Sequence, residues 1–178
     1  SFFVTYATID GWNAHSSQLT APSSNKLDRW ILGELNKLIV QETEYMNGYD
    51  LQKASNCIYD FVDSLTNWYI RRSRRRFWKS EDDGDKASAY ETLYHVLTEL
   101  GKIIAPFMPV VSEAIYQNLT GQASVHLTDY PRATLSDQDE ALMNEMFLTK
   151  TIVILGLASG SKLKIKVRQP LQKVQIAL

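Results

Sequence analysis

The residues best suited to chemistry lie in one short run, WYIRRSRRRFW, which spans residues 68–78. The run contains five arginines, whose planar guanidinium groups can donate paired hydrogen bonds to phosphate oxygens. Four aromatic residues lie at its two ends, and aromatic rings can stack on unpaired bases. Three roles are open to such a run: binding of nucleic acid, a solvated helix end, or a set of buried ion pairs.

The charge of the chain is concentrated in the same place. Residues 71–79 carry six positive charges and no acid, whereas the whole chain has a net charge of −1. Subtracting these six charges from −1 leaves −7 for the rest of the chain. The positive potential is therefore focused on one segment, as expected of a surface that attracts an anionic partner.

No arrangement of residues predicts an active site. His15, His95 and His126 are far apart in the sequence and have no metal-ligand partner at helical spacing. The segment GLASGSK (156–162) has three residues between its glycines, where a phosphate-binding loop needs four. The single cysteine, Cys57, excludes an internal disulfide and a multi-cysteine zinc site, and we expect it to be a buried thiol.

The elements that must position the arginines are helices. Apolar residues recur at three- and four-residue spacing in five segments, which begin near residues 27, 51, 86, 110 and 137. Asp50 and Asp85 can cap the second and third helices, and Gly121 can end the fourth. The segments KLKIKV (162–167) and KVQIAL (173–178) alternate polar and apolar residues, which predicts two short strands.

This pattern predicts an all-α fold, an up-and-down helical bundle with a short β element at its C-terminus. The apolar first dozen residues resemble the end of a preceding structure, and residues 13–25 resemble a connector. No uninterrupted apolar run is long enough to span a bilayer, and the low cysteine content favours the cytoplasm.

A helical wheel at 100° per residue divides the arginines into two sectors. Arg72 and Arg76 continue the apolar stripe of the second helix, so we expect them to lie over the end of the bundle and pair with carboxylates. The other sector holds Arg71, Arg74 and Arg75 together with Trp78. A solvated helix end usually mixes Lys and Glu, so a face of arginines with one tryptophan favours RNA or DNA.

Six segments resemble the isoleucyl-tRNA synthetases, a family of class I aminoacyl-tRNA synthetases, and follow one another in the expected order over almost the whole chain. They are LDRWILGELN (27–36), NWYIRRSRRRFW (67–78), AYETLYHVL (89–97), IAPFMPVVSEAIYQNL (104–119), SVHLTDYP (124–131) and IKVRQPL (165–171).

The resemblance implies three parts: the exit of a catalytic domain with its connector (1–25), a helical anticodon-binding domain (26–160), and the start of a C-terminal junction element (161–178). It implies that the domain binds the anticodon stem-loop of the isoleucine tRNA and positions this tRNA for aminoacylation elsewhere. The parent enzyme would use ATP and magnesium. The chain lacks the catalytic motifs and the editing domain, so we expect no catalytic residue, metal ligand or cofactor here, and no activity from this chain alone.

The resemblance also assigns the partner and its contacts. The partner is the isoleucine tRNA, bound by a monomer without a membrane partner. The predicted tRNA-binding residues are Arg71, Arg74, Arg75, Arg76, Trp78, Lys79 and Arg168. Two alternatives remain, a helical DNA-binding domain and a protein-interaction module whose basic helix meets an acidic partner.

Overall fold

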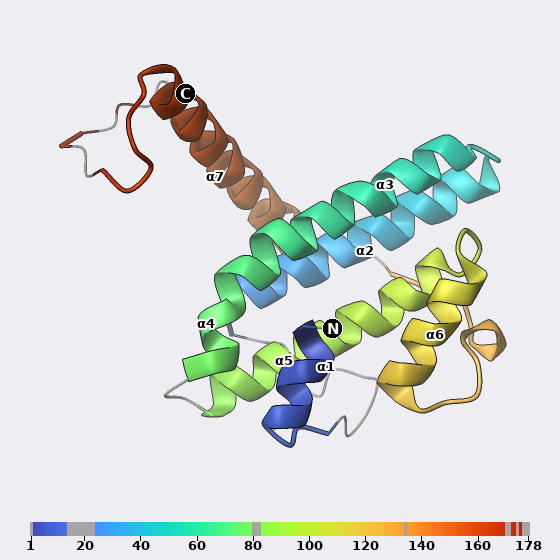
Figure 1. The fold of residues 1–178 in the computed structure, drawn as a ribbon. Helices are drawn as coiled ribbons and strands as arrows, with labels where there is room; N and C mark the ends of the chain where they lie inside the picture. The colour runs from blue at the N-terminus through green and yellow to red at the C-terminus, as the bar shows by residue number, and fades with distance from the viewer. Residues whose placement is uncertain are drawn as a thin grey trace. The chain divides into compact units, whose positions relative to one another are not determined.

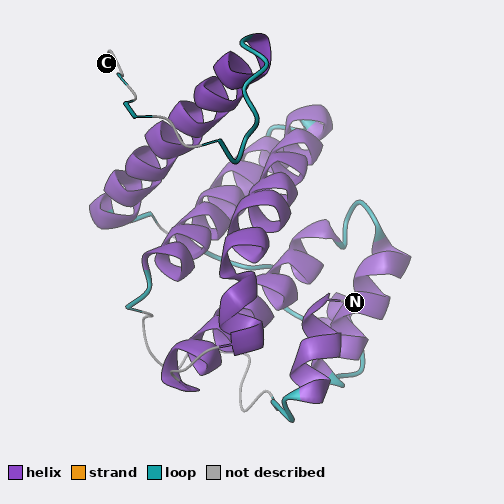
Figure 2. Ribbon diagram, turned by 60° about the vertical axis from the view of Figure 1, so that its left-hand side comes forward, coloured by secondary structure: helices purple, strands orange, loops and turns teal. Residues whose placement is uncertain are grey.

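The computed structural model describes residues 2–13, 24–79, 83–133, 135–169, 172–173 and 175, and divides the chain into two compact units, Ser1–Ser136 and Asp137–Leu178. In these residues the regular elements are helices, as the all-α prediction requires (Figures 1 and 2). The first unit contains α1 (Phe2–Ile9), α2 (Lys26–Asn47), α3 (Leu51–Asp63), the π-helix η1 (Ser64–Ile70), α4 (Arg71–Lys79), α5 (Asp83–Ile104), α6 (Pro109–Thr120) and the short 3₁₀ turn η2 (Val125–Leu127).

Helices α2 and α3 form a long antiparallel hairpin (Figure 1). Asn25 caps α2 by accepting a hydrogen bond from the Leu27 amide, at 2.9 Å. After the turn that closes the hairpin, Asp50 caps α3 by accepting from the Lys53 amide at 3.1 Å, as the sequence predicted. Large apolar side chains of α2, among them Trp30 and Leu35, are almost fully buried.

Helices α5 and α6 form a second antiparallel hairpin, and α5 also packs against α2 (Figure 1). Pro109 occupies the first turn of α6, where its missing N–H costs no hydrogen bond. Gly121 ends α6 with a φ of 68°, a left-handed conformation that favours glycine and confirms the predicted end of this helix. Asp85, predicted as the cap of α5, lies instead inside that helix and pairs with Arg76.

The predicted second helix is interrupted by a π-helix. Residues 64–70 form η1, in which each turn holds about one residue more than an α-turn. The wheel assumed α-geometry throughout, so it placed Arg72 on the buried stripe beyond η1. The buried positions of α4 are Ser73 and Phe77, one residue further along, and Arg72 is exposed.

The second unit contains α7 (Asp137–Lys162), and the predicted C-terminal strands are not seen in its described residues. Residue 162 ends α7 and residues 163–167 form turns and irregular structure, so the strand prediction for KLKIKV is wrong. An alternating pattern needs a neighbouring strand to pair with, and the described part of this unit offers none. Most of KVQIAL lies outside the described residues.

Helix α7 is also long and apolar enough to cross a membrane, judged by length and composition over Asp139–Lys162. This helix contains no long uninterrupted apolar run, because polar residues interrupt it, but its mean hydropathy is high. One such helix is weak evidence of a membrane span, because core helices of soluble proteins pass the same test. The predicted boundaries near residues 25 and 160 remain predictions about the arrangement of domains.

Candidate nucleic-acid interface

Helix α4 presents an exposed basic face, formed by Arg71, Arg74 and Arg75. None of the three forms an ion pair with a carboxylate in the part of the chain that the structure describes. Their guanidinium groups are therefore free to bind an external anion. We call these three residues the arginine face.

Trp78 lies at the edge of the arginine face, and 51% of it is exposed. The guanidinium of Arg74 is 5.4 Å from the centre of its ring, within range of a cation–π interaction. The ring of Tyr6, from α1, lies 5.9 Å away and is tilted by 50°. Trp78 thus contacts its own protein in part and exposes the rest of its ring, which leaves room for stacking on a base.

Arg76 does not belong to this face, although the sequence placed it among the tRNA-binding residues. Its Nη1 and Nη2 atoms donate to the two carboxylate oxygens of Asp28 on α2, at 2.6 and 2.9 Å. Its Nε and Nη2 atoms donate to Asp85 on α5, at 2.8 and 2.7 Å. The geometry indicates a structural role, which the wheel had offered as one reading, because the side chain of Arg76 is only 11% exposed.

The contacts of Arg76 are part of a larger polar cluster that joins four elements. Asp28 is fully buried and also accepts hydrogen bonds from the hydroxyls of Tyr69 on η1, at 2.7 Å, and Ser88 on α5, at 3.3 Å. Asn25 donates to Asp85 at 3.3 Å. Because the two carboxylates hold Arg76 between them, this cluster sets the position of α4 relative to α2 and α5. We call it the Arg76 cluster.

The Arg76 cluster also shifts the ionisation of its members. Burial opposes the charge of Arg76, but the hydrogen bonds from its guanidinium to Asp28 and Asp85 outweigh burial and raise its pKa. The same guanidinium lowers the pKa of Asp85 below its ordinary value of 3.8. Burial and the neighbouring charge of Asp28 raise the pKa of Tyr69 well above its ordinary value. The ion pair between Arg76 and Asp85 is therefore maintained throughout the neutral range.

Arg72 takes a different place from the one predicted. Its guanidinium carbon lies 3.8 Å from the centre of the Trp68 ring, so it stacks on an aromatic face of η1. No ion pair of Arg72 is present among the described residues, and the side chain is exposed. The prediction that Arg72 pairs with carboxylates is wrong, because the one-residue shift introduced by η1 gives its place on the buried stripe to Ser73. Of the two arginines predicted to pair, Arg76 alone does so among the described residues.

The other two predicted contacts are less well placed by the structure. Lys79 ends α4, and its side chain lies outside the described residues. Arg168 is exposed in a turn of the second unit. Both remain predictions of tRNA contact.

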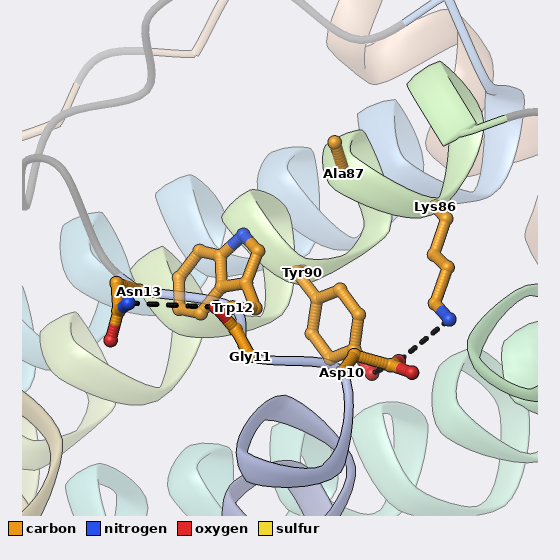
Figure 3. A pocket seen from close by; sticks show the side chains of 7 residues that line it. All are labelled: Asp10, Gly11, Trp12, Asn13, Lys86, Ala87 and Tyr90. Carbon is orange, nitrogen blue, oxygen red and sulfur yellow. Dashed lines mark hydrogen bonds and ion pairs between the residues drawn. The ribbon is translucent and has the colours of Figure 1, made fainter.

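A pocket of about 410 Å³ lies where the chain leaves α1 and meets α5 (Figure 3). The carboxylate of Asp10 accepts hydrogen bonds from Lys86, at 2.7 Å, and from the Tyr90 hydroxyl. Trp12 stacks on the Tyr90 ring, with 5.6 Å between the ring centres. The charges of Asp10 and Lys86 pair with each other, and the described residues that line the pocket include no Ser, Thr, Cys or His. Its contacts fasten the end of α1 to α5.

The described residues also lack a candidate metal centre, because no three His, Cys, Asp or Glu side chains gather at one point there. The segment 156–162, compared above with a phosphate-binding loop, is helical within α7. Cys57 is half-buried rather than buried, its thiol donates to the Ala54 carbonyl at 3.0 Å, and burial raises its pKa.

The sequence did not reveal which acids bind Arg76 and so distinguish it from the exposed arginines. Asp28 is a lone acid in the first turn of an amphipathic helix, where a role at the helix N-terminus explains it. A stronger signal was present in the buried stripe, where Phe61, Leu65, Tyr69, Ser73 and Phe77 repeat at four-residue spacing. Such a repeat drifts around an α-helix and stays on one face only if a turn is widened.

Comparison with known proteins identifies the family of the chain. Residues 28–176 match the family described as the anticodon-binding domain of tRNA ligase. The chain is 48% identical over 184 residues to the isoleucine–tRNA ligase of Dehalococcoides mccartyi (strain CBDB1), covering 100% of this chain and 18% of that protein. It is 45% identical over 180 residues to that of Protochlamydia amoebophila (strain UWE25), with 99% and 17% covered.

A third relative, the isoleucine–tRNA ligase of Treponema denticola, is 41% identical over 190 residues, with 99% of this chain and 17% of that protein covered. The chain thus spans less than a fifth of the length of these relatives. The family match extends over most of the chain and includes α4 and the whole Arg76 cluster except Asn25. The chain belongs to the family of anticodon-binding domains of tRNA ligases.

Proposed function

We propose that this chain binds the anticodon stem-loop of the isoleucine tRNA through the arginine face of α4. The observation that carries the proposal is the exposure of three arginines that form no ion pair among the described residues, on a helix inside the matched anticodon-binding region. Guanidinium groups hydrogen-bond phosphate oxygens in pairs, and the half-exposed ring of Trp78 offers a surface for one unpaired base.

The choice of isoleucine tRNA rests on the relatives, which are named isoleucine–tRNA ligases. The chain would act as part of such a ligase, a cytoplasmic monomer that joins isoleucine to its tRNA with ATP and magnesium. The role of this region would be to position the tRNA, as expected of an anticodon-binding domain. The chemical step would take place elsewhere in the larger protein.

Two alternatives predict different preferences. A DNA-binding domain would prefer duplex DNA, and a protein-interaction module would prefer an acidic polypeptide. Salt weakens binding in all three cases, so salt dependence alone does not distinguish them.

A competition experiment tests whether the chain recognises the anticodon stem-loop. A labelled isoleucine tRNA stem-loop bound to the full chain should be displaced by the same stem-loop unlabelled, less well by one with a changed anticodon, and least by duplex DNA. Equal displacement by all three competitors would refute anticodon recognition. Trp78 fluorescence, taken as the difference between wild type and Trp78→Phe, should change when the stem-loop is added, and an unchanged difference would remove Trp78 from the interface.

A further inference from the structure

We propose that the RNA-binding surface extends from α4 onto the first turn of α2, where Lys26 and Arg29 contact the phosphate backbone. This inference rests on the proposed function and adds a second helix to the interface. It starts from two exposed cations that the sequence analysis did not single out.

The Arg76 cluster brings the first turn of α2 to α4. Asp28, in that turn, holds the Arg76 guanidinium at 2.6 and 2.9 Å. Asn25, the cap of the same turn, donates to Asp85, the other carboxylate that binds Arg76. Two positions of one helical turn therefore contact the immediate surroundings of Arg76, and Figure 1 shows the start of α2 beside α4.

Lys26 and Arg29 lie on the outer side of this turn. Both side chains are exposed, whereas Asp28 between them is fully buried and directed at Arg76. Because Lys26 and Arg29 are three residues apart on a helix, their side chains are neighbours on one face. The residues 71 and 75 on α4 are four apart and form a second basic pair in the same way.

Neither basic pair forms an ion pair within the described residues. Asp28 and Asp85, the two carboxylates of the Arg76 cluster, are both bound to Arg76. The positive end of the α2 dipole points out of the same turn and adds to the potential. A surface with cations on two adjoining helices suits an RNA backbone, which presents a succession of phosphates and not one anion.

The size of the effect follows from counterion release. Each phosphate contact contributes about 0.7 to 0.9 to the slope of log K against log salt concentration, so two contacts contribute about 1.4 to 1.8. If the two contacts are purely electrostatic and vanish at 1 M salt, the lower slope predicts about a 25-fold loss of affinity at 0.1 M salt. Loss of one contact would then weaken binding about fivefold.

The test is titration of the isoleucine tRNA stem-loop into the full chain at several salt concentrations. Lys26→Gln/Arg29→Gln should bind about 25-fold more weakly at 0.1 M salt and have a flatter salt slope, with an unchanged melting temperature. Lys37→Gln is the matched control, because Lys37 lies on the same helix about 16 Å from Lys26. This control should bind like the wild type.

The outcomes separate this inference from the proposed function. If Lys26→Gln/Arg29→Gln binds like the wild type while Arg74→Gln/Arg75→Gln binds weakly, the interface is confined to α4 and the inference is wrong. An equal loss in Lys37→Gln would also overturn it, because the effect would then come from net charge alone. If Arg74→Gln/Arg75→Gln binds like the wild type, the proposed function itself fails.

Discussion

Replacement of Arg76 by methionine should destabilise the fold without removing a contact to RNA. Methionine keeps much of the side-chain length but removes every hydrogen bond to Asp28 and Asp85. The carboxylate of Asp28, 0% exposed, would then remain buried without its ion-pair partner, while the hydroxyls of Tyr69 and Ser88 would still donate to it. Removing one partner of a buried ion pair costs about 3–5 kcal/mol, and because hydrogen bonds to Asp28 remain, we expect about 3 kcal/mol for Arg76→Met.

For a chain of this size, 1 kcal/mol lowers the melting temperature by about 2–4 °C, so we expect a decrease of about 6–12 °C. Thermal unfolding followed by circular dichroism measures it directly. Arg75→Met is the matched control on the same helix, and because Arg75 is exposed it should change stability by less than about 0.5 kcal/mol. If Arg76→Met melts like the control, the Arg76 cluster does not hold α4 in place and the assignment of the two arginine sets is wrong.

Three further predictions follow from the contacts. Arg72→Ala should cost only about 0.5–1 kcal/mol in urea unfolding, because the contact of this exposed side chain among the described residues is a cation–π contact with Trp68. A loss above about 3 kcal/mol would point to a buried ion pair. A hydrogen bond from Arg76 lowers the pKa of Asp85 in the folded protein, and hydrogen bonds from Lys86 and then Tyr90 lower the pKa of Asp10. Both carboxylates therefore contribute stability that is complete above their ordinary pKa of 3.8 and is lost as the pH falls through the lowered pKa values. Acid unfolding of Asp10→Asn should therefore be less steep than that of the wild type, and an identical curve would contradict the pairing with Lys86. Burial raises the folded pKa of Glu42, whose carboxylate accepts from Tyr130, so its contribution is present below its ordinary value of 4.5 and lost as the pH rises through the raised value. We expect Glu42→Gln to remove this loss of stability, measured by unfolding between pH 4 and pH 8. If the stability of the variant falls with pH as steeply as that of the wild type, folding does not raise the pKa of Glu42.

Much of the fold was predictable because helix patterns and caps are local. The periodicity located the helices that became α2, α3, α5 and α6, and the caps at Asp50 and Gly121 were identified from residue type alone. The C-terminal strands were not predictable in this way, because an alternating stretch becomes a strand only when another strand lies beside it.

The division of the arginines depended on information that is not local. The wheel assigned Arg72 and Arg76 to a structural set, but η1 turns Arg72 away from the buried stripe and onto the Trp68 ring, whereas Arg76 reaches the carboxylates. The partners of Arg76 come from residues 28 and 85, on two other helices. Only the packed structure brings these carboxylates to one guanidinium and thereby leaves the arginine face free.

The central claim is that the exposed arginines of α4 bind the isoleucine anticodon stem-loop. The most direct measurement is the dissociation constant of this stem-loop for wild type and for Arg74→Gln/Arg75→Gln, at one salt concentration and with melting temperatures recorded. We predict binding at least tenfold weaker in the variant with an unchanged melting temperature, since two phosphate contacts are lost. Equal dissociation constants in the two proteins would contradict the account.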